Sequence, residues 1–185
     1  FREALYNIYY TLFGLNHLPF RLLSFAFHFL NIALVYTLLQ KLFGQKFFSF
    51  FVAFFFGITA ANVGSLYYLA GGIQVLGVTS FSLLSLVFFW EWLKTRQSKF
   101  KLFSFITFLF SLGSHEIAAV TPILLVGLIW VKFPIKKVIS RATKELWPFF
   151  VALAAYLYLD IVQIGFGQKE IQYLPVFSPK PVLNS

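Results

Sequence analysis

A run of 44 residues without a charged side chain, 47–90, constrains this chain more than any other sequence feature. A transmembrane helix needs about 20 consecutive apolar residues, so a run of this length predicts two membrane crossings joined by a short turn. We expect the turn at 62–72, because this stretch contains three glycines that interrupt the helical pattern. Its two adjacent tyrosines are typical of the aromatic belt at a membrane surface.

The composition extends this interpretation to the whole chain. Of the 185 residues, 59% are hydrophobic and only 11% are charged, whereas soluble domains carry about 25% charged residues. We therefore predict an all-α, polytopic transmembrane helix bundle of about six spans with additional interfacial helices. Residues 1–19 should form an interfacial helix at the outer face, and 165–185 an outer tail. The expected spans are about 20–40, 47–63, 73–93, 102–113, 117–131 and 147–164.

The net charge of +9 is concentrated in three short segments. Lys41–Lys46, Lys94–Lys101 and Lys132–Lys144 hold 11 of the 15 Lys and Arg residues. Positive charge near transmembrane helices marks the cytoplasmic side, so the charge is interpreted as a topology signal rather than as a nucleic-acid surface. We predict an integral membrane protein of the bacterial inner membrane or an equivalent membrane, with the basic loops cytoplasmic and no nucleic-acid partner.

The apolar stretch 102–131 lies between the second and third basic segments and must therefore cross the membrane an even number of times. Its 30 residues allow about 15 for each of two crossings, which is short for a full span. We predict a hairpin of two short helices with residues 113–116 at a recessed outer tip, and Pro122 near the start of the returning helix. One long tilted helix is the alternative, but it would place a basic segment outside.

The predicted tip carries an imidazole and a carboxylate side by side, His115 and Glu116. Ionisable groups within an apolar segment are costly and mark functional sites by default. With Arg2 on the same side of the membrane, they would line a mixed-charge cavity that suits a ligand with an anionic head group and an apolar tail. The alternative is a turn at the surface, where Glu116 is simply solvated.

A second polar pair lies within the first predicted span. His28 and Asn31 are three residues apart and therefore share one face of a helix. Lipid cannot satisfy their hydrogen-bonding groups, so we predict that both contact other helices of the bundle. Contact with a ligand is the alternative.

Two residue types are missing from the chain. Without cysteine, disulfides and thiolate metal sites are excluded. Without methionine, and with Phe1 as the first residue, the sequence suggests a fragment of a longer protein.

Several short motifs resemble class C glycosyltransferases, and among them the protein O-mannosyltransferase-like membrane proteins, including those with tetratricopeptide repeats. Phe1–Leu5 and Phe13–Asn16 are similar to the family's Tyr-Arg-Pro-Leu and Phe-Gly-Leu-Asn patterns. His28 and Asn31 match its Leu-Leu-His-x-x-Asn helix. Ser114–Ala118, followed by Pro122, is similar to its Ser-Lys-Glu-Thr-Ala segment with a later proline.

The resemblance implies a multi-span enzyme that uses a polyprenyl-phosphate-linked sugar at the outer face of the membrane. In such an enzyme a carboxylate deprotonates the acceptor while basic groups hold the lipid phosphate. It implies that Arg2, His115 and Glu116 contact this head group, with Glu116 acting through His115, Arg2 or a divalent metal ion, because two anions repel. Glu3 and His115 stand where the family has Pro and Lys.

No catalytic residue is assigned, because the family's catalytic Asp lies upstream of the segment that Phe1 begins. An enzyme fragment is therefore one hypothesis. The second is a non-catalytic membrane subunit that keeps the scaffold and serves assembly with other membrane subunits or lipid binding. A proton-coupled transporter using Glu116 is a third, although no inverted repeat is apparent. All three predict membrane lipids as partners.

Overall fold

The computed structural model describes residues 2–14, 16–59 and 61–164. Within these ranges the chain forms eight α-helices, one 3-10 helix and no strand, which confirms the all-α prediction for the described residues. The predicted tail, 165–185, lies outside them. The elements are α1 (Arg2–Phe13), α2 (His17–Phe43), α3 (Lys46–Ile58), α4 (Ala61–Tyr67), α5 (Leu69–Thr95), α6 (Ser98–Leu112), η1 (Glu116–Val120), α7 (Thr121–Lys132) and α8 (Ile135–Ile164).

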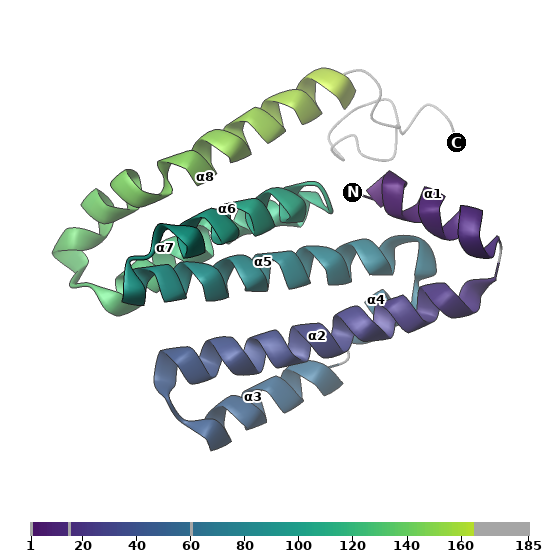
Figure 1. The fold of residues 1–185 in the computed structure, drawn as a ribbon, viewed down its shortest axis with the longest axis horizontal. Helices are drawn as coiled ribbons and strands as arrows, with labels where there is room; N and C mark the ends of the chain where they lie inside the picture. The colour runs from purple at the N-terminus through teal and green to yellow at the C-terminus, as the bar shows by residue number, and fades with distance from the viewer. Residues whose placement is uncertain (1, 15, 60, 165–185) are drawn as a thin grey trace, which may run out of the picture.

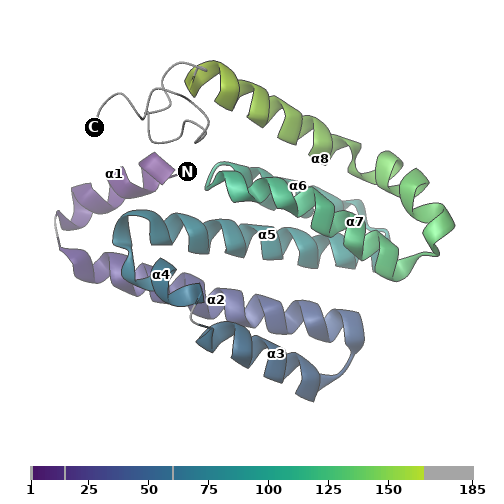
Figure 2. The ribbon, with the colours of Figure 1, turned by 180° about the vertical axis from the view of Figure 1, so that it is seen from behind.

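Helix α5 is the central element of the bundle. It packs against α2 and α4 on one side and against α6, η1 and α7 on the other. Helix α8 covers α6 and α7, while α3 lies on the outer side of α2 (Figures 1 and 2). Two of these helices, α2 and the 71–95 part of α5, are long and apolar enough to cross a membrane. The arrangement of six spans stays a prediction.

A hydrophobic core lies between α5, α6, α7 and α8, and it includes the fully buried Phe149 of α8. The Phe149 ring lies 5.3 Å from that of Phe105, 5.4 Å from that of Phe108 and 6.1 Å from that of Phe89. Aromatic pairs at these separations add attraction to that of area burial alone. These contacts join helices that are far apart in sequence and hold α8 on the bundle.

The three basic segments lie at one end of the bundle, on the left in Figure 1, while the 113–115 reversal lies at the other. Several basic residues sit in the last turn of a helix rather than in a loop. Lys94 donates to the Lys41 carbonyl at 3.0 Å, and Lys132 donates to the Leu93 carbonyl. The last carbonyls of a helix have no intrahelical partner, so lysines are favoured there.

The first half of the uncharged run differs from the predicted span 47–63, because α3 already ends at Ile58. Thr59 is extended, and its hydroxyl donates to the Phe55 carbonyl at 2.6 Å. The His28 ring reaches the Gly57 carbonyl across 3.0 Å. Side chains thus satisfy two of the carbonyls that the end of the helix leaves without intrahelical partners, those of Phe55 and Gly57.

The predicted turn 62–72 is largely helical. Helix α4 ends at Tyr67 and α5 begins at Leu69, so the second and third glycines of this stretch lie inside α5. A Cβ atom on Gly72 would lie 1.8 Å from the Ser65 carbonyl oxygen. This glycine therefore permits two backbones to approach closely, rather than reversing the chain.

The ends of the chain also differ in detail from the prediction. Helix α2 begins at His17, before Pro19, because the Asn16 side chain accepts the Leu18 N–H at 3.0 Å and caps the helix. Pro19 falls in the first turn, where a missing N–H breaks no helical bond. The predicted span 147–164 is the second half of α8, whose first half contains most of the third basic segment.

Candidate functional site

The chain reverses direction between α6 and η1, at the position where the sequence places the hairpin tip. Helix α6 ends at Leu112, and the Gly113 N–H donates to the Leu109 carbonyl at 3.0 Å. His115 is extended and begins η1 as its N-cap, with Nδ1 accepting the Ile117 N–H at 3.3 Å. The tip is therefore held by backbone bonds and by one imidazole.

His115 and Glu116 face each other at this tip. His115 Nδ1 lies 3.3 Å from Glu116 Oε2, and the Glu116 side chain is 74% exposed while that of His115 is 24% exposed. In the neutral imidazole Nδ1 accepts the Ile117 N–H, so the ring hydrogen is on Nε2 and is available as a donor. Protonation would instead direct an Nδ1–H toward Glu116 at the expense of the cap. The pair offers one donor and one carboxylate to a ligand.

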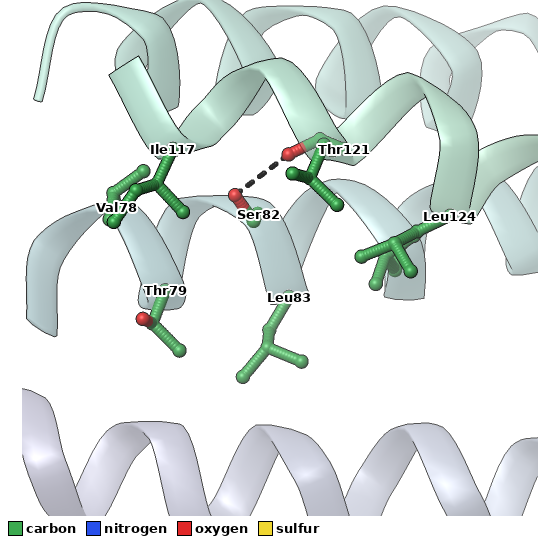
Figure 3. Close-up of a pocket in the computed structure, with 9 residues that line it drawn as sticks. Val78, Thr79, Ser82, Leu83, Ile117, Thr121 and Leu124 are labelled. Atoms are coloured by element: carbon green, nitrogen blue, oxygen red, sulfur yellow. Dashed lines mark hydrogen bonds between the residues drawn. The ribbon is translucent and has the colours of Figure 1, made fainter. Parts of the chain in front are cut away.

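An apolar pocket of 220 Å³ begins at the next residue, Ile117 (Figure 3). It lies between α5 on one side and η1 with α7 on the other. Neither His115 nor Glu116 lines it, so the polar pair lies beside the pocket rather than in it. The lining residues are Val78, Thr79, Ser82, Leu83, Leu86, Ile117, Val120, Thr121 and Leu124.

The hydroxyl groups of the pocket are bonded within the fold. Ser82 Oγ is 2.9 Å from Thr121 Oγ1 (Figure 3) and 2.7 Å from Ser111 Oγ. Thr79 donates to the Val75 carbonyl at 2.8 Å. With these groups paired, the wall is suited to an apolar chain rather than a polar ligand.

The hydroxyl cluster of Ser82, Ser111 and Thr121 was not predicted from the sequence. Small hydroxyl residues within apolar segments are enriched where helices contact one another, so their positions in 73–131 were the available signal. That signal identifies contact positions, but not which hydroxyls meet. The meeting of Ser82 with Ser111 and Thr121 depends on how α5, α6 and α7 pack.

The structure brings together only part of the predicted site. The backbone of Arg2 begins α1, but its side chain lies outside the described part of the chain. No group of three or more His, Asp or Glu side chains that could hold a metal ion occurs among the described residues. Among the described residues, the candidate site therefore consists of His115, Glu116 and the adjoining pocket.

The other predicted pair is buried and bonded across helices. Asn31, 1% exposed, donates to the Leu76 carbonyl at 3.1 Å and accepts from the Ser80 hydroxyl at 2.6 Å. His28, 6% exposed, bonds to the Gly57 carbonyl. Because a carbonyl only accepts, His28 Nε2 carries the hydrogen, and Nδ1 is buried without a partner among the described residues.

Comparison with protein-family models, with curated proteins and with solved structures gives no match for this chain.

Proposed function

We propose that this chain is the membrane-embedded part of a glycosyltransferase that moves a sugar from a polyprenyl-phosphate carrier to an acceptor at the outer face. The basic end would lie in the cytoplasm and the tip outside. The proposal is supported by one observation above all, the polar pair His115 and Glu116 directly beside an apolar pocket. Such an arrangement suits a ligand with a polar head and an apolar chain.

Each part of the site then has a role. The isoprenyl chain lies against the apolar wall formed by α5 and α7, which no unpaired hydroxyl interrupts. The His115 ring donates from Nε2 to a phosphate oxygen of the head group. Glu116 orients His115 or a sugar hydroxyl, since direct contact between a carboxylate and a phosphate is repulsive.

A non-catalytic lipid-binding subunit is the second candidate, and the distribution of carboxylates favours it. Among the described side chains Glu116 is the one carboxylate at the tip, whereas Glu91 and Glu145 pair with lysines or arginine at the opposite end. A transfer reaction needs a base positioned on the acceptor. Sugar transfer by the purified full-length protein separates the two candidates, because both predict lipid binding.

The pocket can be tested by filling it. Leu124→Trp places a large side chain in the lining, whereas Ile123→Trp adds the same side chain at an exposed neighbouring position of α7 that does not line the pocket. We expect Leu124→Trp to weaken binding of polyprenyl phosphate about tenfold or more, while Ile123→Trp leaves it within twofold, since lost apolar burial of ~1.4 kcal/mol gives a factor of ten. Binding would be measured in detergent by microscale thermophoresis.

The polar pair is tested in the same assay. Glu116→Gln should reduce binding or transfer without loss of expression, and His115→Lys, which restores the residue of the resembled family, should preserve or strengthen it. If Glu116→Gln, His115→Lys and Leu124→Trp all left binding and transfer unchanged, the proposal would be overturned. The tip would then be only a solvated turn.

A further inference from the structure

Four cations from three helices converge at the basic end. Lys94 and Arg96 come from the end of α5, Lys132 ends α7, and Arg141 belongs to α8. The Arg141 guanidinium lies 4.0 Å from the centre of the Phe133 ring, while Arg96 and Lys132 each lie 5.9 Å from it. Burial lowers the pKa of Lys132, and the neighbouring charges of Arg96, Lys94 and Arg141 lower it further. The positive charges of the cluster therefore repel one another.

The described carboxylates do not balance this charge. Glu145 forms ion pairs with Arg96 at 3.4 Å and with Lys101 at 3.2 Å. Lys94 and Lys132 donate to backbone carbonyls instead. Arg141 has no ion pair within the described part of the chain. Three of the four cations thus lack a carboxylate, and an anion placed among them would relieve their repulsion.

The surroundings indicate what kind of anion fits. Large apolar side chains adjoin the cluster in sequence and are more than half exposed: Trp130, Val131, Ile135 and Ile139. A soluble anion would leave this apolar surface uncovered. A lipid can cover it with its chains while its phosphate meets the cations. We propose that Lys94, Lys132 and Arg141 bind the phosphate of an anionic phospholipid at the basic end of the bundle.

The test compares two basic residues of the same helix. Arg141→Gln removes a cation of the cluster, and Lys144→Gln removes an equal charge three residues along α8, from a side chain outside the cluster contacts. Binding of one phosphatidylglycerol to delipidated protein in detergent is followed by native mass spectrometry. We expect Arg141→Gln to weaken it about fivefold and Lys144→Gln by less than twofold. Equal losses would overturn the site, because they indicate a diffuse attraction to positive charge.

A second variant should change affinity in the opposite direction. Glu145→Gln removes the carboxylate that partly neutralises Arg96, so phosphatidylglycerol should bind more tightly, an outcome that misfolding does not produce. Phosphatidylcholine and soluble glycerol phosphate serve as comparison ligands. Binding of glycerol phosphate as strong as that of phosphatidylglycerol would overturn the lipid assignment. The assay contains no polyprenyl phosphate, so its result is independent of the function proposed for the tip.

Discussion

Two histidines of this apolar chain have opposite surroundings. His28 is buried between α2 and α3 and bonds to a backbone carbonyl, and Asn31 beside it completes a bonded polar layer with α5. His115 lies at the reversal between α6 and α7, beside the exposed carboxylate of Glu116. His28 also lines an apolar pocket of about 520 Å³ bordered by α2 and α3, whereas His115 lies beside the smaller pocket without lining it. The two histidines therefore differ in burial and in their bonding partners, and we propose a structural role for His28 and ligand contact for His115.

The largest effect is expected on the buried side. Asn31→Asp keeps the shape of the side chain but replaces the amide that donates to the Leu76 carbonyl with an acceptor, and it buries an unpaired charge. We expect a loss of about 3 kcal/mol in free energy of unfolding, or failure to fold. Thermal unfolding in detergent measures it. A loss below about 0.5 kcal/mol would mean that Asn31 is accessible to water and that the comparison is wrong.

A smaller loss is expected at His28. His28→Leu removes the bond to the Gly57 carbonyl but also removes the unpaired Nδ1 atom, so part of the cost is offset. We expect the variant to be less stable by about 1–2 kcal/mol. Lipid binding should be unchanged when it is assayed well below the melting temperature. Loss of lipid affinity at unchanged thermal stability would instead place His28 in a binding site.

The smallest effect on stability is expected at the tip. Glu116→Gln replaces a carboxylate with an amide, whereas Asn31→Asp replaces an amide with a carboxylate. Because the Glu116 side chain is 74% exposed, its substitution should change the free energy of unfolding by no more than about 0.5 kcal/mol. Urea unfolding of the two isosteric variants in parallel gives the comparison directly. If Glu116→Gln destabilised the protein as much as Asn31→Asp, the tip would be structural rather than a binding site.

Several features of the fold could be predicted because they depend on local sequence. The uncharged run at 47–90 predicted helices on both sides of a break, and helices do form there. The helix break at Tyr68 lies within the predicted 62–72, but α3 already ends at Ile58, and Gly71 and Gly72 lie inside α5 rather than in a turn. Gly72 instead allows α5 to approach Ser65, a contact that no local pattern reveals. The candidate site was predicted as far as His115 and Glu116, but its adjoining pocket was not.

The sequence by itself determined that this chain is helical and where most helices lie, since apolar helices satisfy their backbone groups within one segment. It also identified the polar residues, such as His28 and Asn31, whose side chains need hydrogen-bond partners in an apolar environment. Only the tertiary structure decided their partners. His28 meets Gly57, Ser82 meets Thr121, and Arg141 lies over Phe133 because of how the helices pack. Hydrogen bonds and charge contacts act over a few ångströms, and sequence spacing does not specify which helices come that close.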